Sequence, residues 1–407
     1  HEDDAQRAVH AALGIPAALA QINQQLAAEH DVRLVARVGI HTGPVVVGEM
    51  GSSAHSENLA MGETPNVAAR LQSLADPGAA VINGRKRQLV GQMFALEPLP
   101  DTKLKGVATT MQAFVVTGER QVETRFASSH SAGSAAMVGR QSELALLLDR
   151  WRQARAGSGQ VVVLTGEAGI GKSCIVSALA DALAPEEHLR VSYQCSPFHT
   201  GTALHPVIRQ LGFAAGIAAN DPPETQLDRL EQLLRQWHDD LSVSVPLLGA
   251  LLGLGDAAEA RHGKLNLSPE QRRERTLQSV FDLLTGAAEK RPVLAVLEDA
   301  HWIDPTTLKL LELARDRIDD HRLMLLVTAR PTFGGAFGSH PAVSHLSLNR
   351  LGRESIFQII ERVSHPKTLP PGLMREIATK TDGVPLFVEE LTKTLLESGQ
   401  LRDTGQA

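Results

Sequence analysis

Apolar residues recur at helical spacing near the start of the chain. Ala5, Ala8, Val9 and Ala12 fall on one face of a helix, and the stripe continues beyond Pro16 to Ile22 and Leu26. Proline in a helix interior removes one backbone hydrogen bond. The pattern therefore predicts one long amphipathic helix over residues 1–28, either straight or bent near Pro16.

Shorter apolar runs follow this helix. Residues 34–40 and 45–48 are predicted to be strands joined by a tight turn at 41–44. A helix is predicted over residues 66–75. Further strands are predicted at 79–82, 94–96 and 111–116. This mixture predicts an α+β unit over residues 1–117.

The second half of the chain has longer runs of β-branched and aliphatic residues. Buried strands are predicted at 161–165, 189–193, 293–297 and 323–329. Helices are predicted at 175–183, over most of 220–290, at 353–364 and at 372–380. We therefore expect an α/β domain with a parallel sheet flanked by helices over 137–350, and a helical subdomain over 351–407. Residues 118–136 lack apolar periodicity and are predicted to be a linker.

Composition narrows the class of protein. The chain has 407 residues, 43% hydrophobic and 21% charged, which is ordinary for a soluble globular protein. A net charge of −6 argues against a nucleic-acid partner. No apolar run approaches the roughly 20 residues that span a bilayer, and no signal peptide is evident. Two cysteines form no disulfide framework, so we expect a cytoplasmic protein. The absence of an initiator Met suggests a fragment.

A phosphate-binding pattern directly follows the strand at 161–165. The sequence Gly166-Glu167-Ala168-Gly169-Ile170-Gly171-Lys172-Ser173 fits G-x-x-x-x-G-K-[ST] and leads through Cys174 into a predicted helix. Glycines let successive amides turn toward phosphate oxygens, and the helix N-terminus favours the anion. Lys172 is expected to reach the β- and γ-phosphates, and the Ser173 hydroxyl to hold Mg²⁺. The alternative is a plain glycine turn.

Polar residues end two later strands. The strand at 293–297 ends in Glu298-Asp299, which in this context is expected to supply a metal carboxylate and a base, with Glu298 as the metal residue unless the roles are exchanged. At the end of the strand at 323–329, either Thr328 or Arg330 is expected to sense the γ-phosphate. Glu298, Asp299 and Ser173 thus form the predicted Mg²⁺ site beside ATP.

The first unit resembles the C-terminal part of the class III nucleotide cyclase catalytic domain. The resemblance rests on three blocks in order: residues 37–43 (RVGIHTG), 62–70 (GETPNVAAR) and 104–106 (LKG). It implies a partial ferredoxin-like α+β fold, a nucleoside triphosphate substrate and a dimer. It also implies that Asn66 orients the ribose, that Arg70 stabilises charge on the α-phosphate, and that Lys105 contacts the terminal phosphates.

Two departures from the cyclase pattern limit this prediction. The family's metal-binding aspartates lie on strands that would precede residue 1, so this chain is not expected to form that two-metal site alone. The position that selects the base is Leu59, which cannot hydrogen-bond a base edge. ATP and GTP therefore remain open as substrates, and a vestigial cyclase unit remains an alternative. We also expect residues 1–117 to be unstable in isolation, because apolar surface would be uncovered.

The second region resembles the signal-transduction ATPases with numerous domains, a branch of the AAA+ group. The resemblance rests on the phosphate loop, on residues 298–302 (EDAHW), on residues 328–331 (TARP), and on Gly383-Val384-Pro385. It implies that Pro385 closes the nucleotide pocket. The two resemblances together predict a soluble-type signalling cyclase coupled to a regulatory ATPase. The alternatives are an ATP-gated scaffold or, less favoured by the acidic charge, an ATPase-type transcription regulator.

Overall fold

The structure is a computed structural model in which the chain separates into two compact units, residues 1–134 and 135–407. It describes residues 4–29, 32–43, 45–52, 55–61, 63–84, 87, 90, 94–100, 112–119, 137–218, 221–237, 240–333, 337 and 340–397. Most of the linker predicted at 118–136 lies outside these residues.

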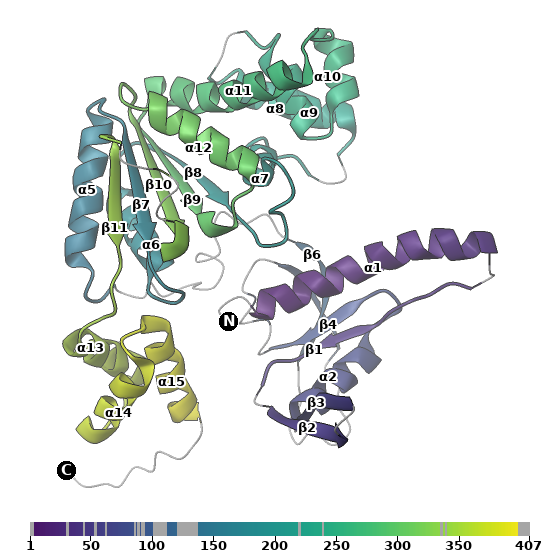
Figure 1. The fold of residues 1–407 in the computed structure, drawn as a ribbon, viewed down its shortest axis with the longest axis vertical. Coiled ribbons are helices and arrows are strands. Elements are labelled where there is room, and N and C mark those ends of the chain that lie inside the picture. The colour runs from purple at the N-terminus through teal and green to yellow at the C-terminus, as the bar shows by residue number, and fades with distance from the viewer. Residues whose placement is uncertain are drawn as a thin grey trace. The chain divides into compact units, whose positions relative to one another are not determined.

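Unit 1 is an α+β unit built on a four-stranded sheet with the order β1-β4-β6-β5 (Figure 1). β1 and β4 are parallel, and the other neighbours are antiparallel. The elements are α1 (Asp4–Glu29), β1 (Val38–Ile40), α2 (Glu63–Leu74), β4 (Ala80–Asn83), β5 (Phe94–Pro98) and β6 (Ala113–Glu119). α1 continues through Pro16 as one helix, as its apolar stripe predicts.

The first two predicted strands do not pair with each other, contrary to the tight turn predicted between them. β2 (Val46–Ser52) pairs with β3 (His55–Met61) in a separate ribbon, so the segment at 41–44 does not close a hairpin. β1 is also shorter than predicted, because the Asn23 side chain accepts from the Leu34 N–H and donates to its carbonyl, at 2.8 and 2.9 Å. These bonds hold the upstream residues to α1 rather than to the sheet.

A glycine sets the distance between α2 and the sheet. A Cβ added at Gly39 of β1 would lie 2.2 Å from the Ala68 carbonyl oxygen and from the Gln72 nitrogen. The α2 backbone therefore lies directly on β1. Val67 and Leu71 of α2 are buried against Val81 of β4.

Unit 2 contains a five-stranded, fully parallel sheet with the order β11-β7-β10-β9-β8, which confirms the predicted parallel sheet (Figure 1). The strands are β7 (Gln160–Thr165), β8 (Leu189–Gln194), β9 (Val293–Glu298), β10 (Leu323–Ala329) and β11 (Val343–Ser347). The hydrophobic pattern did not predict β11, because Ser344, His345 and Ser347 interrupt its apolar residues.

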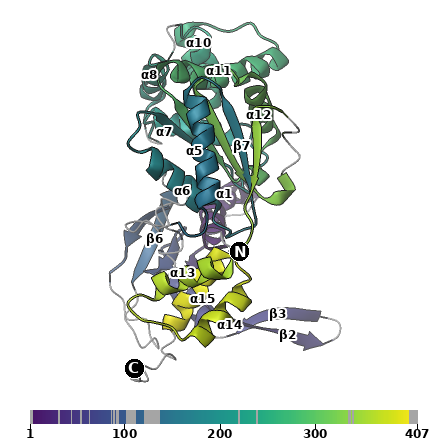
Figure 2. The same ribbon diagram turned by 90° about the vertical axis from the view of Figure 1, so that its left-hand side faces the viewer.

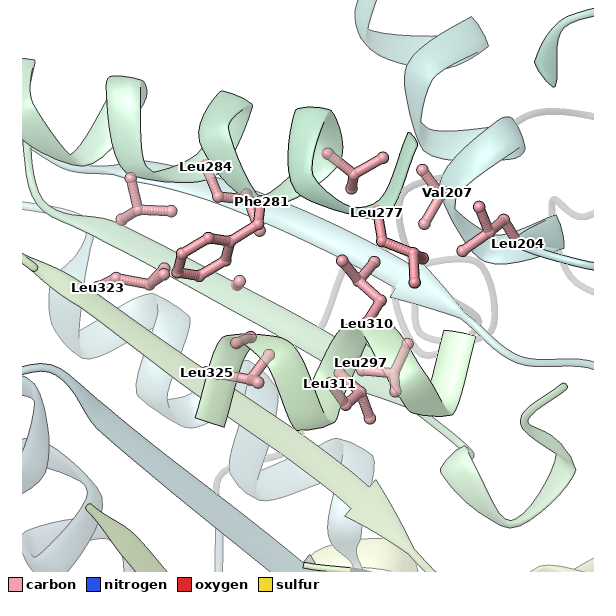
Figure 3. Close-up of a cluster of buried hydrophobic side chains, with 14 of the residues drawn as sticks. Leu204, Val207, Leu277, Phe281, Leu284, Leu297, Leu310, Leu311, Leu323 and Leu325 are labelled. Atoms are coloured by element: carbon pink, nitrogen blue, oxygen red, sulfur yellow. The ribbon is translucent and has the colours of Figure 1, made fainter. Parts of the chain in front are cut away.

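Alternate residues of the central strands face two different cores. Val162, Leu326 and Val296 pack with α5 (Gln141–Arg155) and α6 (Lys172–Leu183), which cover one face of the sheet (Figure 2). The other face packs on a helical layer that includes α11 (Pro269–Lys290) and α12 (Pro305–Arg317), whose leucines and Phe281 fill the space over β10 (Figure 3). Because both faces of these strands are buried, residues on either face are apolar, which explains the uninterrupted apolar runs.

Among the described residues, six helices contribute to the core on this side of the sheet, and four of them, α8 to α11, account for the helical pattern predicted for most of 220–290. The six helices are α7 (His205–Ala214), α8 (Pro223–Leu234), α9 (Ser244–Leu251), α10 (Gly255–His262), α11 (Pro269–Lys290) and α12 (Pro305–Arg317). Ser268 forms a capping box with Gln271 at the start of α11. Buried Asp304 accepts hydrogen bonds from the N–H groups of Thr306 and Thr307 at the start of α12.

A small helical subdomain follows β11, as predicted. It consists of α13 (Arg353–Ser364), α14 (Pro371–Thr381) and α15 (Pro385–Glu397). Ile359, Ile360, Ile377 and Val388 form its buried centre. Figure 2 shows the three helices gathered below the sheet of unit 2.

Candidate nucleotide site

The predicted phosphate loop joins β7 to α6. Gly169 and Gly171 have φ values of +72° and +103°, in the left-handed region that favours glycine. A Cβ at Gly166 would lie 2.7 Å from the Ile170 side chain, and one at Gly169 would lie 2.9 Å from Leu386 Cβ. Close approach of neighbouring atoms therefore requires glycine at 166, and the backbone conformation requires it at 171. Both reasons apply at 169.

The polar residues of the loop gather at the start of α6. Lys172 is the first residue of this helix, and its Nζ donates to the carbonyls of Gly166 at 2.9 Å and Glu167 at 2.8 Å. Ser173 and Cys174 follow in the first turn and are half-buried. Burial raises the pKa of the Cys174 thiol. The ammonium and the Ser173 hydroxyl thus lie at the positive end of a helix.

The predicted carboxylates lie at the same edge of the sheet as the loop. β7, β10 and β9 are parallel neighbours, so their carboxyl ends align, and the Gly166 N–H donates to the Ala329 carbonyl at 3.2 Å. Glu298 ends β9 and is 4% exposed. Asp299 follows it in the left-handed region, at φ 58°. An Asp in this conformation is uncommon and is held by its surroundings.

Two polar contacts hold Asp299. Its N–H donates to Thr328 Oγ1 at 3.1 Å, and its carboxylate accepts from Gln194 Nε2 at 2.9 Å. Thr328 is buried and shapes the carboxylate turn, whereas Arg330 is half-buried with its guanidinium 5.7 Å from the Trp302 ring centroid. Of the two predicted sensors, Arg330 is the more exposed.

The Gly-x-Pro segment contacts the phosphate loop directly. Pro385 begins α15, and the following Leu386 N–H donates to the Gly169 carbonyl at 3.2 Å. Gly383 has φ +76° and its N-terminal neighbour, Asp382, has φ 49°. The chain reversal there places Pro385 and Leu386 over the loop.

Sequence patterns missed three polar residues that contact this site. Gln194 contacts Asp299, Arg350 lies 3.2 Å from the Glu167 carboxylate, and Arg140 donates to the Ile170 carbonyl at 3.3 Å. Gln194 ends a parallel strand, and this position alone could have indicated it. Arg140 lies in a segment recognised only as a domain start, and nothing local distinguishes Arg350.

Two of the three predicted cyclase residues lie on α2 of unit 1. Asn66 is exposed and Arg70 is half-buried, and their spacing places them on one face of the helix. Gly43 lets its loop approach this helix, since a Cβ there would lie 2.5 Å from Thr64 Oγ1. Lys105 lies outside the described residues. Leu59 lies opposite Gly48 in the β2–β3 ribbon.

The sheet order, the glycine loop and the strand-end carboxylates define unit 2 as a P-loop nucleotide-binding domain. In agreement, residues 136–327 match the family model of the AAA ATPase domain. Residues 1–118 match the model of the adenylate and guanylate cyclase catalytic domain. The chain thus carries a class III cyclase catalytic domain followed by an AAA P-loop ATPase domain.

Two curated relatives come from Rhizobium meliloti (strain 1021). One, described as uncharacterized, is 27% identical over 392 residues, which are 96% of this chain and 37% of that protein. The other, Adenylate cyclase 1, is 33% identical over 134 residues, which are 32% of this chain and 20% of that protein. The chain therefore spans well under half the length of these relatives.

Solved structures match each region separately. The guanylyl cyclase Cya2 is 28% identical, with a TM-score of 0.28, covering 30% of this chain and 61% of that one. A Signal Transduction ATPase with Numerous Domains from Pyrococcus horikoshii is 16% identical, with a TM-score of 0.35, covering 66% and 31%. Among the helices of the described residues, none has the length and apolar character of a membrane span.

Proposed function

We propose that unit 2 binds and hydrolyses ATP, and that its nucleotide state controls cyclase activity in the full-length protein. The observation that carries the proposal is the shape of residues 166–173. Two left-handed glycines turn the loop, Lys172 opens the following helix, and the Glu298–Asp299 turn ends a strand at the same sheet edge. This arrangement supports a triphosphate cradle faced by carboxylates.

The residues present are suited to Mg²⁺ and ATP. Within the described part of the chain, no cluster of three or more His, Cys, Asp or Glu side chains could form a metal site of protein ligands alone. Magnesium bound with nucleotide needs few protein ligands, because phosphates and waters complete its octahedron. Ser173, Glu298 and Asp299 would hold the ion and its waters, and Mg²⁺ would neutralise charge on the transferred phosphoryl group.

The chain's own groups would then divide the work. Loop amides and Lys172 would hold the phosphates, and Asp299, positioned by Gln194 and Thr328, would accept the proton of the attacking water. Arg330 would sense the γ-phosphate, and Pro385 would close the nucleotide pocket near the adenine of ATP.

In unit 1, Asn66, Arg70 and Lys105 would bind the nucleoside triphosphate during cyclisation, in which the ribose 3′-hydroxyl displaces pyrophosphate. The pair on α2 supports this role, since an Arg fork suits charge on a phosphorus centre. Two copies would share the site, as the cyclase resemblance implies. We propose no cyclase activity for residues 1–407 alone.

Calorimetry with Mg-ATP tests the proposal. Lys172→Ala should abolish detectable binding, because the loop loses the ammonium that balances the phosphate charge. Lys309→Ala removes an exposed lysine of α12 and should leave the affinity unchanged. Equal affinity of Lys172→Ala and the unchanged chain would refute the ATP site.

An ATP-gated scaffold with a vestigial cyclase is the second candidate, and Leu59 favours it because its side chain cannot hydrogen-bond a base. An assay of cyclic-nucleotide formation by the full-length protein separates the two functions. Product formed from ATP or GTP would support the cyclase. ATP binding without any product would support the scaffold.

A further inference from the structure

The chain segment between β11 and α13 lies between the phosphate loop and the helical subdomain. Arg140 and Arg350 hold this segment against its neighbours. Arg140 is 6% exposed, and its guanidinium donates to the Ile170 carbonyl of the loop and to the Asn349 carbonyl of the segment. Two residues beyond Asn349, the Leu351 N–H donates to the Gly383 carbonyl at 2.9 Å. Residue 350 is therefore held by its neighbours on both sides.

Arg350 itself contacts a carboxylate on each side of this segment. Its guanidinium lies 3.2 Å from the Glu167 carboxylate of the phosphate loop. The same group forms an ion pair with Asp382, directly before the Gly-x-Pro segment. The three side chains are between 47% and 72% exposed. Arg350 thus bridges the nucleotide loop and the turn that leads into α15.

The bridge lies beside a backbone contact between the same two segments. The Leu386 N–H donates to the Gly169 carbonyl, and Leu386 is the second residue of α15. Amides in the first turn of a helix have no intrahelical partner. Protection of this amide therefore depends on contact between the helical subdomain and the loop.

From this geometry we propose that Arg350 is a positioning residue that couples the phosphate loop to the helical subdomain. While the bridge is intact, α15 stays against Gly169 and slows nucleotide release. Buried Arg140 provides the permanent attachment, and exposed Arg350 provides one that ions or a ligand can displace. The effect on nucleotide release depends on the proposed ATP site, whereas the effect on the contact between segments does not.

Hydrogen exchange tests the contact without any nucleotide. In Arg350→Gln, exchange of the Leu386 amide should accelerate about threefold to fivefold, the effect of losing exposed ion pairs. The Phe387 amide, which donates to the Val384 carbonyl within its own turn, should change less. Arg350→Lys keeps the charge and should stay within about twofold of the unchanged chain. Arg353→Gln, an exposed control at the start of α13, should have no effect.

Stopped-flow release of a fluorescent ATP analogue tests the consequence. Release from Arg350→Gln should be about threefold to fivefold faster at low salt. The difference should vanish near 1 M salt, where the Debye length is about 3 Å. A purely structural defect would persist at high salt, and that result would overturn the bridge.

The two readouts separate the possible failures. Unchanged Leu386 exchange in Arg350→Gln would overturn the coupling, whatever the nucleotide does. Failure of the unchanged chain to bind the analogue would refute the ATP site, while faster Leu386 exchange in Arg350→Gln would still support the bridge.

Discussion

The two units expose apolar side chains very differently. Six of the ten large hydrophobic residues exposed among the described residues lie between positions 15 and 45, on α1 and the segments that follow it: Ile15, Ile22, Val32, Leu34, Val35 and Val45. In unit 2 the strands β7, β9 and β10 are buried on both faces between helical layers. Unit 2 therefore buries its central strands on both faces, whereas unit 1 exposes more of its large apolar side chains on α1 and in the segments that follow it.

The candidate sites of the two units also differ in how they are built. In unit 2, the loop, the carboxylate turn and the Gly-x-Pro segment are joined by backbone hydrogen bonds and by buried polar side chains. In unit 1, Asn66 and Arg70 lie on one helix, α2, which packs on the sheet through the close approach at Gly39 and through buried Val67 and Leu71. The unit 2 site is therefore assembled from segments far apart in the sequence, whereas the unit 1 pair is presented by a single helix.

The largest expected effect is a difference in stability between the two units. Expressed alone, residues 1–117 should unfold broadly, with a free energy of unfolding below the about 5–15 kcal/mol of ordinary domains. Residues 135–407 should unfold cooperatively, because their core is covered. Urea unfolding followed by circular dichroism measures both. A steep, cooperative transition for residues 1–117 would contradict the comparison.

The next effect concerns Gly39. Gly39→Ala places a Cβ against the α2 backbone, where no flexible side chain can yield, so unit 1 should lose about 1–3 kcal/mol or fail to fold. Unfolding of the whole chain, followed with probes in each unit, should show unit 2 unchanged. A variant as stable as the unchanged chain would mean that α2 does not lie on β1.

The smallest expected effect on stability is that of Gly14→Ala, the matched control for Gly39→Ala within unit 1. Gly14 lies inside α1, with nothing within 4 Å of an added Cβ. Gly14→Ala should stabilise unit 1 by about 0.5–1 kcal/mol, because alanine costs less backbone entropy in a helix. The same urea titration measures it, and a loss of stability would show that α1 is not helical at this position.

Sequence patterns were sufficient for much of this structure. Uninterrupted apolar runs predicted β7, β9 and β10, and glycine spacing predicted the loop between β7 and α6. The pattern failed where pairing depends on distant residues. Nothing local shows that Val38–Ile40 pairs with Ala80–Ile82 rather than with the next strand. Polar β3 and β11 lack the apolar signal.

The candidate site divides in the same way. The loop and the Glu298–Asp299 pair have local signatures, so their positions were predictable. Gln194 and Arg350 contact the site from 105 and 183 residues away in sequence. Only the fold brings them to it, and a single sequence carries no record of such contacts.

The central claim is that the phosphate loop and the Glu298–Asp299 turn form one metal–nucleotide site. A crystal structure with Mn²⁺ and a non-hydrolysable ATP analogue tests it most directly, because manganese gives an anomalous signal. We predict a manganese peak bound to the Ser173 hydroxyl and the phosphates, facing Glu298 and Asp299. Nucleotide bound elsewhere, or manganese distant from both Ser173 and the carboxylates, would contradict the account.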